Sequence, residues 1–209
     1  MAELKFFYGT MSSGKTTMVL QTNYNLNLAF PGSVLLINKF DRSGNNLCSN
    51  RIGNATDALS VNNGESIIEI CREVEKEKNV KLTHILCDEA QFFLPRQVDE
   101  LAYLVDYENI NVVAYGLLTN YKGKIFLGSQ RFIELADRVR EVSNEMRCWC
   151  GKPATHNSLM YTKTKDVEEN EICLDYEVVC RKHFMQTHKS GKLHVNDDGI
   201  TINANNLKV

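Results

Sequence analysis

The fold is decided by the stretch Leu4-Lys5-Phe6-Phe7-Tyr8-Gly9-Thr10-Met11-Ser12-Ser13-Gly14-Lys15-Thr16, which a helix-prone run from Thr17 to Leu28 follows. A strand-like apolar run enters a loop of the pattern G-x-x-x-x-G-K-T, and a helix leaves it. The two glycines let backbone N–H groups turn inward around an anion, while Lys15 reaches the β- and γ-phosphates and the Thr16 hydroxyl holds Mg²⁺. This setting predicts a phosphate-binding loop whose ligand is a nucleoside triphosphate.

Short apolar runs alternate with helical patterns after this loop. We predict strands at Ser33–Asn38, His84–Cys87 and Asn111–Tyr115, and amphipathic helices at Ser66–Lys78 and Pro95–Val105. Alternation of this kind is typical of a parallel sheet with helices on both faces. The sequence therefore predicts an α/β fold of the P-loop (RecA-like) type, in which ligands gather at the carboxyl ends of the strands.

Composition limits the range of partners. The chain has 209 residues, of which 43% are hydrophobic, enough for one core and a small appended lobe. A net charge of −2 and a pI near 6.2 argue against general binding to nucleic acid or anionic membranes, so small molecules are the expected partners. The N-terminus enters a strand at once and no apolar run approaches ~20 residues, so we expect a cytoplasmic protein without a membrane span.

The character of the chain changes along its length. The polar segment 44–64 reads as a long loop with one weak strand at 59–61, and cysteines and lysines replace the regular alternation past Ser143. Near the end, an Asp198-Gly199 turn between two short apolar runs predicts a terminal hairpin. The predicted divisions are a nucleotide-binding α/β domain at 1–145, a zinc-binding lobe with the substrate lid at 146–190, and a tail at 191–209.

Two adjacent acids close the strand that begins at His84. In a P-loop protein the first, Asp88, orients Mg²⁺ through its water shell, and the second, Glu89, acts as a base on the attacking nucleophile. Alone, the pair also suits a solvated strand end that caps a helix. The letters Asp88-Glu89-Ala90-Gln91 also occur in helicases, but a helicase needs a second motor domain, for which this chain has no room.

Cysteines point to a structural metal. Seven cysteines, an odd number, favour reduced thiols with a metal site over a disulfide framework. Three thiolates and one imidazole, from Cys148, Cys150, Cys180 and His183, make a closed tetrahedral zinc site that stabilises a lobe with little core. C-x-C is a less usual spacing than C-x-x-C, so Cys173 and His156 stay open as alternative ligands, as does a set of free cysteines.

Other side chains suit a nucleotide site without deciding it, because exposed cations are common and aromatic residues are more often part of a core. The basic candidates are Lys39, Arg42, Arg51, Lys122, Lys124, Arg131 and Lys152. The aromatic candidates for contact with a base are Phe92, Phe93, Tyr121, Phe126 and Tyr176.

Six ordered motifs resemble the cytosolic, zinc-containing thymidine kinases of bacteria, large DNA viruses and animals, and the resemblance extends to about Phe184. The motifs are the loop at 9–16, Asp88-Glu89-Ala90-Gln91-Phe92-Phe93, Tyr115-Gly116-Leu117-Leu118-Thr119-Asn120-Tyr121, Gly128-Ser129 leading to Glu134-Leu135-Ala136-Asp137, Cys148-Trp149-Cys150-Gly151-Lys152 and Cys180-Arg181-Lys182-His183-Phe184. The resemblance implies transfer of the ATP γ-phosphate to the 5′-hydroxyl of thymidine, giving dTMP for DNA synthesis.

The resemblance also implies roles for single residues. Glu89 is the general base and Lys15 the second catalytic residue. ATP and its Mg²⁺ are expected at Gly9, Thr10, Met11, Ser12, Ser13, Gly14, Lys15, Thr16, Asp88, Glu89, Ala90 and Gln91. Thymidine is expected at Met11, Phe92, Leu117, Tyr121, Phe126, Asn157 and Tyr176, the last two at the ends of a lasso-like lid between the zinc ligands.

Some family features differ here. The family's Asp-x-Arg is replaced by Asp41-Arg42, the usual Gly-Gly is missing before Tyr176, and Ser158 stands near where an arginine is common. Family members are commonly tetrameric, so we expect a homotetramer. The alternatives are a nucleic-acid-stimulated P-loop ATPase with a zinc ribbon, and a nucleotide-binding scaffold without catalysis.

Overall fold

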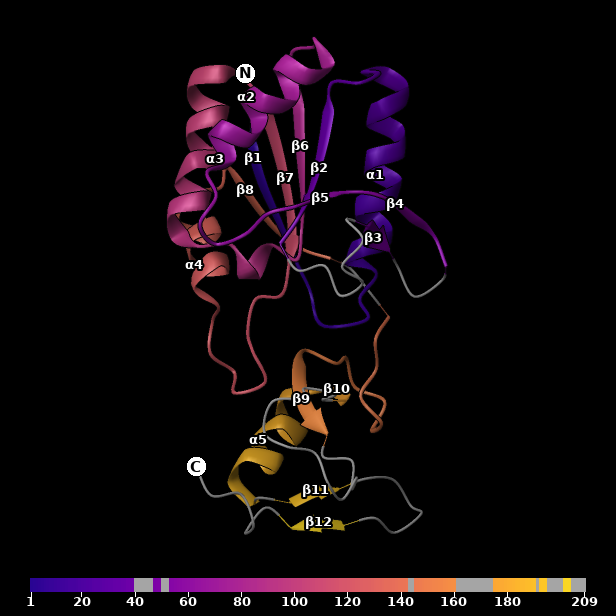
Figure 1. The fold of residues 1–209 in the computed structure, drawn as a ribbon. Helices are drawn as coiled ribbons and strands as arrows, with labels where there is room; N and C mark the ends of the chain where they lie inside the picture. Colours follow the sequence, from indigo (N-terminus) through magenta and orange to yellow (C-terminus); the bar gives the residue numbers. More distant parts are fainter. Residues whose placement is uncertain are drawn as a thin grey trace, which may run out of the picture. The chain divides into compact units, whose positions relative to one another are not determined.

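The computed structural model describes residues 1–39, 47–49, 53–142, 145–160, 175–190, 192–194 and 201–203, and its chain forms two compact units (Figure 1). The first unit holds residues 1–9, 14–118 and 125–143, and the second holds 10–13, 119–124 and 144–209. The domain ranges given above stay a prediction.

A six-stranded sheet forms the centre of the first unit, and every pairing in it is parallel. Its strand order is β5-β2-β6-β7-β1-β8, which confirms the predicted parallel α/β fold. The strands are β1 (Leu4–Tyr8), β2 (Val34–Asn38), β5 (Leu59–Ser60), β6 (His84–Asp88), β7 (Asn111–Gly116) and β8 (Arg138–Glu141).

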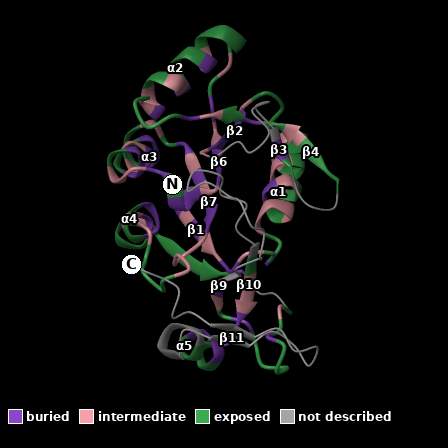
Figure 2. Ribbon diagram, turned by 60° about the horizontal axis from the view of Figure 1, so that its bottom comes forward, coloured by how far each residue is buried: buried purple, intermediate pink, exposed green. Residues whose placement is uncertain are grey.

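Helices cover both faces of this sheet, as predicted (Figure 1). Alternate residues of a strand point to opposite faces, so Leu35 and Ile37 join the larger buried cluster while Val34 and Leu36 join the smaller one. Buried residues lie along the central strands of the sheet (Figure 2). The larger cluster lies under α2 (Ile67–Lys78), α3 (Pro95–Glu108) and α4 (Leu127–Leu135), and the smaller one under α1 (Lys15–Ala29).

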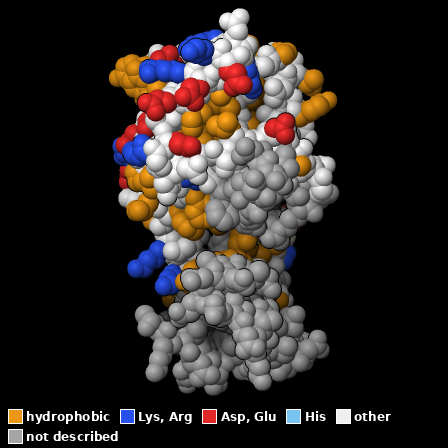
Figure 3. Space-filling view, viewed as in Figure 1, with side chains coloured by type: hydrophobic (Ala, Val, Ile, Leu, Met, Phe, Trp, Pro, Cys, Tyr) orange, Lys and Arg blue, Asp and Glu red, His pale blue; other side chains and the backbone are white. Residues whose placement is uncertain are grey.

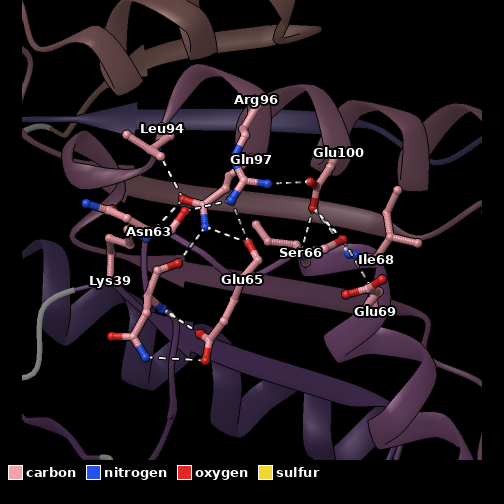
Figure 4. Close-up of polar contacts among 12 residues, drawn as sticks. Lys39, Asn63, Glu65, Ser66, Ile68, Glu69, Leu94, Arg96, Gln97 and Glu100 are labelled. Carbon is pink, nitrogen blue, oxygen red and sulfur yellow. Dashed lines mark hydrogen bonds and ion pairs between the residues drawn. The ribbon is translucent and has the colours of Figure 1, made fainter.

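Helix α2 begins where two side chains satisfy its free backbone N–H groups. The Ser66 hydroxyl accepts from Glu69 N at 3.4 Å, and the Glu100 carboxylate of α3 accepts from Ser66 Oγ, Ile67 N and Ile68 N (Figure 4). The helix ends at Asn79, whose left-handed backbone is a common stop. A side chain of α3 therefore fixes the start of α2.

The buried amide of Gln97 ties three further segments together (Figure 4). Its Nε2 donates to the carbonyl oxygens of Asn62 and Glu65 at 2.9 and 3.1 Å, and its Oε1 accepts from Lys39 Nζ at 2.9 Å and from Leu94 N at 3.2 Å. Every hydrogen-bonding position of the amide is thus used. The end of β2 and the start of α2 are consequently fastened to α3.

The segment predicted as a loop with one weak strand holds more structure than that. The weak strand is present as β5, but β3 (Leu47–Ser49) and β4 (Ala55–Asp57) also pair as an antiparallel hairpin. Strands of three residues are too short for a period-two pattern to show in the sequence. The prediction was therefore incomplete here.

The second unit contains two antiparallel strand pairs. Strand β9 (His156–Met160) pairs with β10 (Asp175–Val179), α5 (Arg181–Ser190) follows, and β11 (Lys192–His194) pairs with β12 (Thr201–Asn203). The last pair confirms the predicted terminal hairpin. The buried apolar cluster of this unit, within the residues the structure describes, consists of Cys148, Val179, Cys180 and Phe184. No described helix is long and apolar enough to cross a membrane.

Candidate functional site

The phosphate-binding loop leaves the sheet at the carboxyl end of β1. Gly9 N donates to the Gly116 carbonyl at the end of neighbouring β7, at 3.2 Å. Gly14 then adopts a left-handed conformation, with φ of 84°, immediately before α1. A side chain is strained at such a φ, so glycine suits this position. The loop therefore joins a strand end to a helix N-terminus, the arrangement that binds phosphate.

Lys15 lies close to two acids in the first unit. Its Nζ donates to the Gly9 carbonyl at 3.4 Å. Burial lowers the pKa of Lys15, while the charges of Glu89 and Asp88 act in the opposite direction. A lysine held near its own loop and balanced by two carboxylates is well placed to exchange those partners for phosphate oxygens.

Asp88 is a buried acid at the end of β6. It is 4% exposed, and burial followed by the charge of Glu89 raises the pKa of its carboxyl. The side chain of Thr16 is hydrogen-bonded to this carboxyl. Mg²⁺ prefers oxygen ligands and commonly takes only one or two from the protein. A hydroxyl and a carboxylate side by side therefore fit the magnesium ion that the loop implies.

Glu89 follows in a backbone conformation that is rare for its residue type, with φ of 52°. Gln91 Nε2 donates to Glu89 Oε2 at 2.6 Å, and Gln91 Oε1 accepts from Leu117 N at 2.9 Å. Non-glycine residues in this region of φ are strained and are found preferentially at functional sites. A chain of two hydrogen bonds therefore holds the carboxylate of Glu89 relative to the segment after β7.

Two glycines, Gly116 and Gly128, lie so close to the short helix η1 (Ala90–Phe92) and its end that neither position has room for a side chain. A Cβ at Gly116 would lie 2.9 Å from both Gln91 N and Gln91 Oε1, and one at Gly128 would lie 2.5 Å from the Phe93 carbonyl oxygen. The Ser129 hydroxyl donates to the Leu117 carbonyl. The glycine-serine pair of α4 thus brings that helix against the turn that carries Glu89.

Two aromatic rings lie next to this turn in the first unit. Phe92 and Phe126 meet edge to face with 5.7 Å between ring centroids, and Phe92 is 40% exposed. Phe93, by contrast, is 1% exposed and belongs to the core. Of the two adjacent phenylalanines, only Phe92 is exposed.

The middle of the phosphate-binding loop, Thr10–Ser13, belongs to the second unit. Met11 N donates to Asn157 Oδ1 of β9 at 2.8 Å, and Asn157 is 5% exposed. Ser13 Oγ is buried and has no hydrogen-bond partner among the described residues. In the same unit, the rings of Tyr121 and Tyr176 lie 6.5 Å apart.

The predicted metal ligands come together in the second unit. One ligand atom from each of Cys148, Cys150, Cys180 and His183 lies within 4.8 Å of the other three. Cys148 Sγ is 3.1 Å from His183 Nδ1, and the Trp149 ring stacks on the imidazole at 3.7 Å. Three sulfurs and one imidazole nitrogen are the donor set of structural zinc sites, so these residues fit a zinc ion.

Comparison with known proteins identifies the family. A sequence model described as thymidine kinase matches residues 2–184. The chain belongs to the thymidine kinase family. This result agrees with the resemblance of the six motifs, which lie within the matched residues.

Individual relatives in the thymidine kinase family match most of the chain. A thymidine kinase of Streptomyces coelicolor is 37% identical over 193 residues, covering 88% of both chains. One of Cutibacterium acnes is 34% identical over 197 residues, covering 89% of both, and one of Mannheimia succiniciproducens is 37% identical over 201 residues, covering 93% of this chain and all of its own. A solved Pif1 helicase from Candida albicans aligns with a TM-score of only 0.43 and 12% identity, covering 68% of this chain and 36% of its own, which is too little to bear on fold or function.

The structure distributes the predicted site residues of this family member over both units. The first unit contains Gly9, Gly14, Lys15, Thr16, Asp88, Glu89, Ala90, Gln91, Phe92, Leu117 and Phe126. The second holds Thr10, Met11, Ser12, Ser13, Tyr121, Asn157 and Tyr176 with the four metal ligands. Asp41, Arg42, Arg51, Cys173 and lid residues 161–174 lie outside the described residues.

Two residues that the sequence offered as candidates make other contacts, and one contact of Asp88 had no signal in the sequence. Arg131, a candidate for the nucleotide, is instead paired with Asp99 and Glu134 on the surface, and His156 lies against Phe184, outside the metal cluster. Cys48 donates to Asp88, a contact that joins residues 40 positions apart and gives no local signal. On the face of the first unit in Figure 3, acidic and basic side chains are intermixed and form no single basic patch.

Proposed function

We propose that this protein transfers the γ-phosphate of ATP to the 5′-hydroxyl of thymidine, giving dTMP and ADP. Membership of the thymidine kinase family supports the choice of substrates. The observation that carries the reaction is the arrangement at the end of β6, where Asp88 and Glu89 interact with the loop lysine, Lys15. The buried hydroxyl of Ser13, with no partner among described residues, supports an oxygen-rich ligand at the loop.

Glu89 is proposed as the general base. Its carboxylate accepts the proton of the 5′-hydroxyl while the 5′-oxygen forms a bond to the γ-phosphorus and the bond to the β,γ-bridging oxygen breaks. The Gln91 amide orients the carboxylate before the substrate arrives. Lys15 neutralises charge on the transferred group. Mg²⁺, held by the Thr16 hydroxyl and oriented by Asp88, supplies further positive charge to the phosphates when it is bound.

Recognition of the base is proposed for seven residues, by carry-over from the family: Met11, Phe92, Leu117, Tyr121, Phe126, Asn157 and Tyr176. The exposed ring of Phe92 and the position of Leu117 beside Gln91 support this assignment in the first unit. The Asn157–Met11 hydrogen bond and the tyrosine pair support it in the second. Cys148, Cys150, Cys180 and His183 are proposed to hold a structural zinc ion. A homotetramer, by analogy with the family, a cytoplasmic location and the two-domain division with a tail are further proposals.

A panel of deoxynucleosides tests the substrate assignment. The full chain is incubated with γ-labelled ATP, Mg²⁺ and each of thymidine, deoxyuridine, deoxycytidine, deoxyadenosine and deoxyguanosine, and the products are separated. We expect labelled dTMP as the main product. Label transferred to none of the nucleosides would contradict the proposal. Phosphate release that requires added DNA would favour the ATPase alternative.

A further inference from the structure

The buried thiol of Cys48 contacts the acid proposed to orient magnesium. Cys48 lies on β3 and is 0% exposed. Its Sγ donates to Asp88 Oδ2 across 3.3 Å, within the range of a hydrogen bond from sulfur. Both residues belong to the first unit, and 39 residues separate them in the chain. The contact therefore depends on tertiary structure rather than on sequence neighbourhood.

Asp88 is held from more than one side. Its Oδ1 accepts from Glu89 N at 3.0 Å, its Oδ2 accepts from Cys48, and the Thr16 side chain also bonds the carboxyl. The Glu89 bond comes from the chain that follows Asp88, so it moves with that chain. The Cys48 bond comes from a separate strand and restricts rotation of the carboxyl about its own side-chain bonds. Removing it takes one hydrogen bond away from a buried acid.

The surroundings of Cys48 favour a thiol over other donors. The sulfur lies in an apolar cluster that includes Val19, Leu36 and Ala58. A thiol behaves as a small apolar group with a weak S–H donor, so it fits such a cluster and still reaches the acid. An unperturbed thiol is protonated at neutral pH, and a neighbouring carboxylate disfavours its ionisation further. Cys48 is therefore the donor and Asp88 the acceptor.

We propose that Cys48 is a positioning residue for Asp88, whose carboxylate it holds in the orientation that serves the magnesium ion of the kinase reaction. The inference rests on the proposed role of Asp88. It assigns the β3–β4 hairpin, which the sequence did not reveal, a part in the site, because Cys48 pairs with Thr56 across that hairpin.

The test measures metal binding without turnover. Mn²⁺ is titrated, as a spectroscopic substitute for Mg²⁺, into the full chain with a non-hydrolysable ATP analogue, and its binding is followed by electron paramagnetic resonance. We expect Cys48→Ala to weaken Mn²⁺ binding about tenfold, the loss of one hydrogen bond to a charged group. Cys48→Ser keeps a donor and should bind Mn²⁺ within about threefold of the wild type.

Controls separate this role from packing. Cys71→Ala removes another buried thiol, in the other core cluster, and should leave Mn²⁺ binding unchanged although it destabilises the fold. If Cys48→Ala and Cys48→Ser unfold, Cys48→Val and Cys48→Thr take their place. These two side chains have the same shape, but threonine has a hydroxyl donor where valine has a methyl group. Kinetics should show a raised magnesium requirement with an unchanged KM for thymidine.

The outcomes distinguish the two levels of the proposal. If Asp88→Asn weakens Mn²⁺ binding and Cys48→Ala does not, the role of Cys48 is wrong and that of Asp88 stands. If Asp88→Asn also has no effect, the proposed role of Asp88 is wrong and the inference falls with it. Equal losses in Cys48→Ala and Cys48→Ser would mean that packing, not the hydrogen bond, matters, and would overturn the inference.

Discussion

The two units of this protein hold their functional residues by different means. In the first, Lys15 begins α1, and Asp88 and Glu89 lie at the carboxyl end of β6 in a parallel sheet with an apolar cluster on each face. In the second, the apolar cluster among the described residues comprises four residues, two of which are themselves candidate metal ligands. A large core fixes the strands and helices that carry such side chains, whereas a lobe with a small core needs a metal to fix its own segments.

Metal removal should have the largest effect, because it should change the stability of the second unit and not that of the first. Loss of zinc, or Cys180→Ser, should unfold the second unit and leave the sheet of the first, because zinc contributes on the order of 10 kcal/mol in small zinc-dependent folds. Hydrogen exchange of the backbone amides, followed separately in β6 of the first unit and β9 of the second, measures the stability of each unit. Unchanged protection of β9 after zinc has been removed, as verified by mass spectrometry, would show that the second unit does not depend on metal.

Filling the space at Gly128 should disturb the first unit at the turn that carries Glu89. A Cβ there would lie 2.5 to 3.0 Å from three backbone carbonyl oxygens, which cannot move as a flexible side chain can. Gly128→Ala should therefore lower the free energy of unfolding by about 1–3 kcal/mol and reduce kcat. Urea denaturation and steady-state kinetics measure both. Gly64→Ala, with open space around its Cβ, is the control, and equal effects of the two would refute this explanation.

The Glu100 cap tests how far polar contacts support the same unit. Its carboxylate accepts from Ser66 Oγ and two backbone N–H groups at the start of α2. Glu100→Ala should destabilise the protein by about 1–2 kcal/mol, the usual cost of a lost cap. Glu73, an exposed residue of α2, supplies a control variant, Glu73→Ala, whose free energy of unfolding should change by less than about 0.5 kcal/mol. Thermal melts that show no difference between the two variants would contradict the role of the cap.

Lys39 should give the smallest effect, visible as a pH dependence. Burial lowers the pKa of Lys39 to about 8, with the charge of Glu65 opposing and that of Arg96 adding to the shift. The folded state then binds fewer protons than the unfolded state between pH 8 and the ordinary lysine value. The free energy of unfolding should therefore rise with pH over that window.

Comparison with Lys39→Met isolates this contribution. Other titrating groups affect both proteins equally, so the difference between their unfolding free energies should grow in favour of the wild type from about pH 8 upward. Because Lys39 is partly exposed, solvent screening limits the change to less than about 1 kcal/mol. Parallel pH profiles for the two proteins would show that Lys39 is an ordinary surface lysine.

The sequence predicted the elements whose pattern is strong and local. The loop at Gly9, the strand that ends at Asp88 and helix α2 were found because glycine spacing and helical periodicity are visible in a single segment. Helix α4 was missed because exposed Leu127 and Ile133 stand beside buried Phe132 and blur its periodicity. Strand β8 was missed because all four of its residues, Arg138–Glu141, are exposed and most are charged.

The candidate site divides in the same way. Asp88 and Glu89 were predicted as an adjacent pair, and the four metal ligands by their spacing. The left-handed backbone of Glu89, its Gln91 contact and the Cys48 hydrogen bond could not be predicted, since each depends on chains that meet only after folding. Sequence patterns thus indicate which groups do the chemistry, while packing decides what holds them.

Glu89 is proposed to take the proton from thymidine, and Glu89→Gln removes its ability to do so. Glutamine preserves the size of the side chain and a polar contact with Gln91, but it removes the basic group. Transfer of labelled γ-phosphate to thymidine is measured in a single turnover, together with ATP binding. Glu134→Gln, at an exposed residue of α4, is the control variant. We predict transfer slowed by about 10²–10⁴-fold with ATP binding nearly unchanged. Transfer at the wild-type rate in Glu89→Gln would contradict the account.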